Sequence, residues 1–353
     1  MIEIDGSIGE GGGQVLRSAL ALSILTGQAL RITNIRARRS KPGLMAQHLK
    51  AVDAAAAISK ARVQGAALNS RQLVFEPTEI RSGRYKFDIQ TAGATTLVLQ
   101  TIFLPLSRAS SASSVIITGG THVPWSPSYH YLELNWLPLL IEMGFDAQIS
   151  LDQAGFYPQG GGRISAVIRP AGIIQPLNLT RRGQLLRLQG ISAVANLPLS
   201  IAERQKRQAL RRLEKLRPHI KTLQMPARFK GTLLLLFAEF ESGRACFFGL
   251  GKLGKPAEQV ADEAVDGLEA FLETDGTVDP YLADQLLLPL CLANGPSELR
   301  TSRVSEHLLT NAAILRAFLP VEIDIQAGLG EPGLVRVLPA ADLSLSSVEG
   351  HGA

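Results

Sequence analysis

Hydrophobic and polar positions alternate along the chain in two different rhythms. Short runs with every second residue apolar indicate strands, and longer runs with apolar residues three or four positions apart indicate helices. Residues 1–80 predict the order strand, helix, strand, helix, strand, strand, and residues 85–170 predict that order again. The chain is therefore expected to contain a repeated βαβαββ unit.

A third unit is expected towards the C-terminus, although its leading strand is not visible beside its first helix. Residues 183–276 carry strands and helices of their own, which indicates an inserted module. Because a sheet with one apolar face must bury that face, the three units should pack around shared helices. The prediction is a large α/β (α+β) domain, 1–182 and 277–353, with an inserted small α/β domain, 183–276. The tail from residue 340 shows no strand or helix signal and is expected to be disordered.

Composition agrees with a folded protein that meets an anionic partner. Of its 353 residues, 46% are hydrophobic and 19% are charged, and this length usually forms two or three packed units. Neither a signal region nor an apolar run of membrane-spanning length is visible, which favours the cytoplasm and no membrane contact. Cys246 and Cys291 lie far apart without metal-ligand neighbours and are expected to be buried thiols. The net charge of +5 and the pI of about 9.3 suit a nucleic acid or nucleotide.

Basic residues form two clusters. The cluster at 204–217 lies on a predicted helix, where a solvated face is favoured over RNA contact and both alternatives stay open. The other cluster contains Arg36, Arg38, Arg39 and Lys41 and is expected at the end of a strand. Alternation would then put successive residues such as Arg38 and Arg39 on opposite faces, so two of the four residues at most would bind one anion.

The segment GSIGEGGGQVLRS leads from a strand into a helix through clustered glycines. Glycines let backbone N–H groups approach an anion, and the start of a helix carries partial positive charge. A tight turn that only needs positive φ is an equal alternative. Glu10 could hold a divalent cation and Arg17 an oxyanion, and both favour a phosphate site. By contrast, GLGKLGKP at 249–256 lacks the hydroxyl residue of a P-loop and the second parallel strand of a dinucleotide site.

His307 begins a predicted helix, with Ser305 as its expected N-cap. A helix start disfavours the imidazolium form, so a ring nitrogen stays free to attack phosphorus. A structural or exposed histidine is the commoner case at such a position, so this residue alone does not decide the function.

Six segments together resemble the RNA 3′-terminal phosphate cyclase family: EGGGQVLRSALALS, RARRSKPGLMAQHL, TAGATTLVLQT, GFYPQGGG, YLADQLLLPL and HLLTNAAILRAFLPV. The resemblance implies three βαβαββ units with an inserted thioredoxin-like α/β module. It also implies that a histidine takes AMP from ATP and passes it to an RNA 3′-phosphate, which the 2′-hydroxyl then closes to a 2′,3′-cyclic phosphate. Mg²⁺ or Mn²⁺ would assist.

The resemblance assigns roles by position in three groups. His307 would be the nucleophile and Glu10 the metal contact. The adenylate site would be lined by Gln100, Pro127, Tyr131, Tyr281, Asp284 and Gln285, with Pro127 and Tyr131 around the adenine. The phosphates and the RNA end would meet Gln14, Arg17, Arg36, Arg39 and Gln47. Tyr281 and Gln100 could instead satisfy buried backbone groups, and Asp284 could form a surface salt bridge.

Two other functions remain open. One is a non-catalytic RNA-binding or ribosome-assembly factor of the same fold, from a branch that lacks the nucleophile, so the presence of His307 favours the enzyme. The other is an enolpyruvyl transferase, which shares the βαβαββ unit, although a shared fold does not settle function. The RNA substrate and the oligomeric state stay undetermined.

Overall fold

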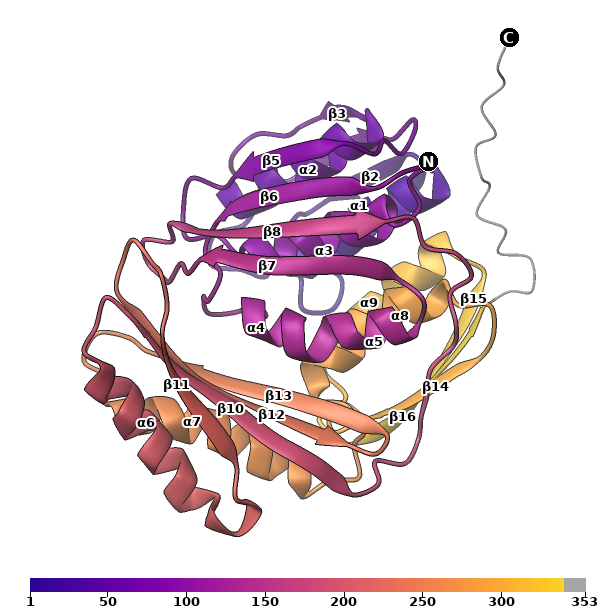
Figure 1. Cartoon of the computed structure of the whole chain (residues 1–353). Helices are drawn as coiled ribbons and strands as arrows, with labels where there is room; N and C mark the ends of the chain where they lie inside the picture. The colour runs from indigo at the N-terminus through magenta and orange to yellow at the C-terminus, as the bar shows by residue number, and fades with distance from the viewer. Residues whose placement is uncertain (340–353) are drawn as a thin grey trace.

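The computed structural model describes residues 1–339, so the predicted disorder of the tail lies outside the described residues. It is a mixed α/β structure with four small mixed sheets (Figure 1). The first unit forms a sheet in the order β1-β2-β4-β3, and the second forms a sheet in the order β5-β6-β8-β7. The first unit consists of β1 (Ile2–Asp5), α1 (Gly13–Thr26), β2 (Leu30–Thr33), α2 (Ala46–Ser59), β3 (Arg62–Gln64) and β4 (Leu73–Glu76).

The second unit contains a helix of mixed geometry where the sequence predicts one continuous helix. A five-residue π-helical segment, Leu132–Trp136, joins α4 (Tyr129–Tyr131) to α5 (Leu137–Glu142). Such segments are rare and often occur at functional sites. The other elements are β5 (Arg84–Asp88), α3 (Thr95–Leu106), β6 (Ser113–Gly119), β7 (Asp146–Gln153) and β8 (Gly162–Arg169).

The third unit does have a leading strand, which the sequence pattern missed. It is β9 (Asn178–Leu179), which has two residues and precedes the inserted module. A strand this short shows no alternation, and the module separates it from its own helix. The sheet order is β15-β16-β14-β9. The remaining elements are α8 (Pro280–Cys291), β14 (Ser297–Thr301), α9 (Glu306–Phe318), β15 (Val321–Gln326) and β16 (Gly333–Pro339).

The inserted module contains one strand more than the sequence predicts. Its sheet has the order β11-β10-β12-β13. The missed strand, β11 (His219–Gln224), is polar and lies at an edge, where it pairs in parallel with β10. Its residues continue the basic cluster, which hid the strand. The module also contains β10 (Leu185–Ala195), α6 (Leu199–Arg212), β12 (Gly231–Phe240), β13 (Gly243–Leu250) and α7 (Ala257–Leu272).

The basic helix α6 is partly neutralised inside the module. Arg204 pairs with Glu258 of α7 at 2.7 Å, and Arg212 pairs with Asp262 at 3.1 Å. Figure 1 shows α6 and α7 side by side on the outer face of the module sheet. These two arginines link the helices at the surface, where the Arg204 side chain stays half exposed, so the solvated face of this cluster stays a prediction.

A hydrophobic core lies between the sheets of the three units and the helices that pack against them. Helix α1 packs against α2, α3 and α9, so the first and third units share one helical layer. The module is joined to the third sheet through Val278, which bridges Arg244 of β13 and Thr301 of β14. Within residues 1–339, no helix is long and apolar enough to cross a membrane. Both cysteines are buried thiols, as predicted.

Candidate active site

A cavity of about 1050 Å³ lies where the helical layer meets the inserted module. Its walls come from α1, α2, α3, α8 and α9, from the loop before α4, and from β13 and α7 of the module. Every residue that the sequence assigns to a site lines this cavity: Glu10, Gln14, Arg17, Arg36, Arg39, Gln47, Gln100, Pro127, Tyr131, Tyr281, Asp284, Gln285 and His307. The fold therefore gathers positions that are up to 297 residues apart, from Glu10 to His307.

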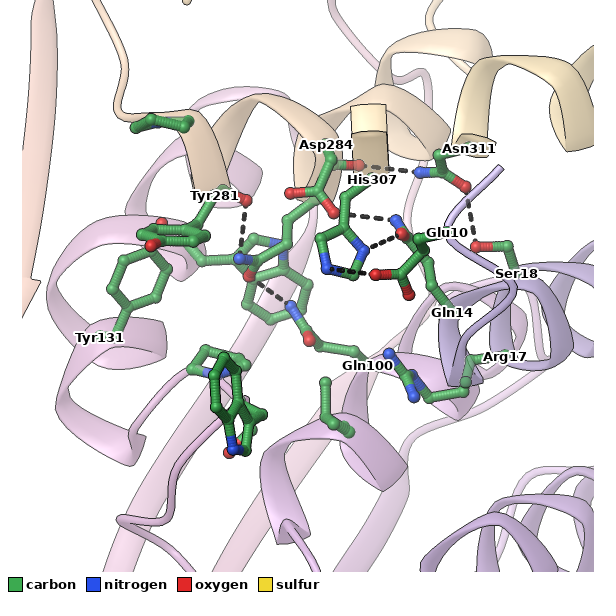
Figure 2. Close-up of a pocket in the computed structure, with 18 of the residues that line it drawn as sticks. Glu10, Gln14, Arg17, Ser18, Gln100, Tyr131, Tyr281, Asp284, His307 and Asn311 are labelled. Atoms are coloured by element: carbon green, nitrogen blue, oxygen red, sulfur yellow. Dashed lines mark hydrogen bonds and ion pairs between the residues drawn. The ribbon is translucent and has the colours of Figure 1, made fainter. Parts of the chain in front are cut away.

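His307 lies at the second position of α9, one residue inside the predicted helix start. The Ser305 hydroxyl oxygen caps the helix by accepting a hydrogen bond from the Leu308 N–H at 3.1 Å. Both ring nitrogens of His307 have partners from the glycine-rich segment, as Figure 2 shows. Nδ1 meets the Gln14 amide oxygen, and Nε2 lies 3.1 Å from a carboxylate oxygen of Glu10. The ring is thus held between a neutral acceptor and an acidic one.

A buried carboxyl group sets the orientation of the Gln14 amide. Gln14 Nε2 donates to Asp284 Oδ2 at 2.8 Å, which turns the amide oxygen towards His307. Asp284 in turn is fixed on α8, and its backbone carbonyl accepts a hydrogen bond from Asn311 of α9. In the neutral tautomer that donates from Nδ1 to Gln14, the lone pair is on Nε2, the nitrogen that faces Glu10.

The protonation states in this cluster follow from burial. Desolvation lowers the pKa of His307, and Arg17 and Arg39 lower it further, while Glu10 opposes the shift. Desolvation also raises the pKa of Asp284, to about 8. At neutral pH the imidazole is therefore favoured over the imidazolium. The surface salt bridge considered for Asp284 is wrong, because its side-chain partner is the amide of Gln14 in the interior.

The glycine-rich segment forms the tight turn that was one of the two alternatives for it, and it does so at the edge of the cavity. Gly9 and Gly11 have φ of +58° and +57°, as a tight turn requires. A Cβ on Gly12 would lie 2.0 Å from a Glu10 carboxylate oxygen and 2.7 Å from an Arg39 guanidinium nitrogen. Only glycine lets the charged groups of Glu10 and Arg39 close over the start of α1, where they pair at 2.8 Å.

The predicted phosphate-binding residues differ in whether their side chains already form hydrogen bonds within the protein. No hydrogen bond or ion pair of Arg17 occurs within the described chain, and burial lowers its pKa to about 10. Arg36 lies in a turn at φ +54° and donates to the carbonyls of Lys41 and Gly43. Strand β2 ends at Thr33, before Arg36, so the alternation of strand faces does not apply to this basic cluster. Gln47 accepts a hydrogen bond from Ala94 N–H at 2.8 Å, at the start of α3.

The predicted adenylate residues form two groups. Gln100 donates to the Gln285 side chain at 2.7 Å, and Gln285 donates to the Tyr281 carbonyl at 2.7 Å. The Gln100 amide thus donates its hydrogen bond to a side chain. The alternative interpretation of Gln100 had it hydrogen-bonded to a buried backbone group. Tyr281 is half exposed at the cavity. Tyr131, however, is buried, and its hydroxyl donates to Asp279 at 2.8 Å.

A model of the RNA 3′-terminal phosphate cyclase family matches residues 8–325. The chain belongs to this family. It is 44% identical to an RNA 3′-terminal phosphate cyclase from Gloeothece citriformis, over 98% of this chain and 100% of the relative. A relative of the same name from Pseudomonas fluorescens is 47% identical over 92% of this chain and 94% of its own. Another, from Archaeoglobus fulgidus, is 42% identical over 90% of this chain and 96% of its own. Among solved structures, enolpyruvyl transferase NikO from Streptomyces tendae aligns with 96% of this chain and 65% of its own, at 8% identity. The TM-score is 0.26, which is too low to support any statement about fold or function.

Two cavity residues of this cyclase family member were missed by the sequence analysis. His48 is buried beside Gln47, and desolvation together with Arg17 lowers its pKa to about 3, so it is neutral. Its position directly after Gln47 in RARRSKPGLMAQHL could have indicated it. Trp125 lies in the segment PWSPSYHY, two residues before the predicted Pro127.

The described residues offer a modest site for a divalent cation. No group of three or more His, Cys, Asp and Glu side chains gathers in residues 1–339. Glu10 is the carboxylate nearest to His307, and one of its oxygens already meets Arg39 and His307. Mg²⁺ usually takes only one or two protein carboxylates together with phosphate oxygens and water. A single carboxylate beside His307 fits that mode of binding.

Proposed function

We propose that this protein is an ATP-dependent RNA 3′-terminal phosphate cyclase in which His307 carries AMP. One arrangement supports the proposal most strongly: the Nδ1 proton of His307 faces Gln14 in a large cavity, so that Nε2 is the attacking atom. A non-catalytic RNA-binding factor would not need a histidine of fixed tautomer there. The chain belongs to a family whose relatives, described above, are named for this activity, and this supports the reaction class.

In the first step, Nε2 attacks the α-phosphorus of ATP. The bond from that phosphorus to the oxygen that bridges to the β-phosphate breaks, and pyrophosphate leaves with the bonding electrons. The ring then carries AMP on Nε2 and a positive charge, while Nδ1–H still donates to Gln14. The lowered pKa of His307 keeps the lone pair available before the attack.

In the second step, an oxygen of the RNA 3′-phosphate attacks the same phosphorus. Nε2 leaves with its electron pair, and the neutral imidazole is restored. In the third step, the 2′-hydroxyl oxygen attacks the 3′-phosphorus, AMP leaves, and the hydroxyl proton is released to solvent. Arg17 and Arg39 supply positive charge at the phosphates, and Arg17 has its guanidinium free for this within residues 1–339.

Glu10 would hold Mg²⁺ or Mn²⁺, which neutralises phosphate charge when it is bound. Gln100, Tyr281 and Gln285 would position the adenylate, and Pro127 would contact the adenine. For Tyr131, the buried hydroxyl bond to Asp279 supports a role in holding the wall behind the base.

We further infer that the three units are structural repeats, since each has the strand order first, second, fourth, third. The inserted module has the connectivity β-α-β-β-β-α with order β11-β10-β12-β13, which supports a thioredoxin-like kinship.

The test is labelling with ATP that carries a radioactive α-phosphate, in the presence of Mg²⁺ and without RNA. Wild-type protein should take an acid-labile label, and His307→Ala should take none while keeping its fold, since residue 307 is on the cavity surface. Folded wild-type protein that remains unlabelled would refute the histidine–AMP mechanism, as would a labelled His307→Ala variant.

A further inference from the structure

Trp125 is an exposed aromatic side chain on the rim of the cavity. Its side chain is 98% exposed although it lines the cavity, and its backbone has φ +64°. A bulky residue rarely adopts positive φ, and such strain persists only where the surroundings enforce it. An apolar ring fully in water contributes nothing to the core. Neither feature helps folding, so both point to a ligand.

The loop that carries Trp125 is fixed on both sides. The Ser126 hydroxyl donates to the Val123 carbonyl at 3.1 Å, and the Thr96 hydroxyl donates to the Pro127 carbonyl at 2.8 Å. Beneath the loop, the buried rings of His122 and His130 bond each other at 2.8 Å. The indole is therefore presented on a rigid support and loses little freedom when a ligand binds.

The loop is anchored to the start of α3, beside a predicted RNA-contacting residue. Thr95 N–H donates to the Gly120 carbonyl at 2.8 Å, and the neighbouring Ala94 N–H donates to Gln47. Trp125 and Gln47 thus approach the cavity from the same end of one helix.

We propose that Trp125 is a stacking platform for an unpaired nucleobase near the 3′ end of the RNA substrate. This rests on the proposed function, because it assigns a subsite to that substrate. Single-stranded RNA is commonly bound by stacking of its bases on aromatic side chains, which is worth about 5- to 150-fold in affinity per base. The adenine of ATP is the other nucleobase that reaches the cavity.

Two observations favour the RNA base. The cavity of about 1050 Å³ exceeds the upper end of the usual range for one small ligand, so a nucleotide leaves room for a second. A ring that is 98% exposed is open to the solvent through which a polymer enters.

The binding test uses the intrinsic fluorescence of the two tryptophans. Trp136 is buried and Trp125 is exposed, so stacking should change the Trp125 emission selectively. A short single-stranded RNA with a 3′-phosphate, added without ATP, should quench wild-type emission, and Trp125→Phe should lose this quenching. Quenching by ATP and not by RNA would overturn the proposal and assign the ring to adenine. An absence of quenching by either ligand would also overturn it.

The kinetic test separates the substrates. Trp125→Ala should raise KM for the RNA about 5- to 150-fold and leave the rate and ATP dependence of self-adenylylation unchanged. Trp125→Phe should keep most of the RNA affinity. Leu253→Ala, which removes an exposed apolar side chain outside the cavity, is the matched control. An unchanged KM for RNA in Trp125→Ala would refute the subsite. RNA quenching by a protein that never takes label on His307 would refute the mechanism and keep the subsite.

Discussion

Replacing Gln14 by Met tests the claim that an amide fixes the attacking nitrogen of His307. Methionine is similar in length and fills the same space, but it neither accepts the Nδ1 proton nor donates to Asp284. In the wild type, Gln14 makes both contacts, with Asp284 at 2.8 Å. The substitution therefore removes the orientation of the ring while the helix α1 and the cavity wall stay in place.

The expected loss can be worked out from the charge that develops. The ring gains a positive charge as Nε2 bonds to phosphorus, so the Nδ1–H bond to Gln14 becomes a hydrogen bond to a charged group, worth about 1.5–3 kcal/mol. Since about 1.4 kcal/mol corresponds to a tenfold change in rate, self-adenylylation should slow about 10- to 150-fold. Asp284 also loses its donor, which should lower the free energy of unfolding by about 1–3 kcal/mol.

The assay is a single-turnover time course of label transfer from α-labelled ATP, with the fold checked by circular dichroism. The rate should fall while its dependence on ATP concentration stays unchanged. Gln28→Met is the matched control, because Gln28 also reaches from the first unit to α9, at 3.4 Å from the Phe318 carbonyl, but at the far end of the helices. Gln14→Glu should recover part of the rate, since it keeps an acceptor for Nδ1–H and the neutral Asp284 can donate to it.

A wild-type rate in folded Gln14→Met would refute this reasoning. It would mean that the ring reaches its reactive tautomer without Gln14, and that Glu10 alone orients it. An equal loss in Gln28→Met would also count against the idea, because general loosening of the α1–α9 contact would then explain the effect.

Three further predictions concern neighbouring groups. The raised pKa of Asp284 makes wild-type stability fall as pH rises from about 4 to about 8. Asp284→Asn should therefore flatten the pH dependence of Tm, and its Tm relative to that of the wild type should be highest above pH 8. Parallel Tm profiles of the two proteins would contradict the raised pKa. Tyr131→Phe should cost about 1–3 kcal/mol in urea unfolding because Asp279 loses a donor, with AMP transfer retained; a higher KM for ATP at unchanged stability would instead give the hydroxyl a binding role. Arg39→Ala should slow cyclisation of RNA more than self-adenylylation, and equal slowing of both would argue against a contact with the RNA phosphate.

The sequence predicts the elements that have strong periodicity and fails for those that lack it. The helices that line the cavity follow the predicted order of elements, because each carries an apolar face over three or more turns. The strands β9 and β11 were missed because one has two residues and the other is polar at a sheet edge. Residue types and family resemblance identified cavity positions, but they could not show which polar groups are already paired, as for Arg36 and Tyr131.

The buried carboxylate of Asp279 explains why the inserted module can interrupt the third unit without separating it from the cavity. One oxygen caps α8 by accepting from Leu282 N–H at 3.0 Å and also accepts the Tyr131 hydroxyl. The other accepts Asn135 of the π-helical segment at 2.8 Å and Cys246 N–H of β13 at 3.2 Å. A single side chain thus joins the second unit, the module and the helix that carries Tyr281 and Asp284. Because an uncompensated buried carboxylate is costly, these three parts are held in one arrangement, and the module is a structural wall of the cavity.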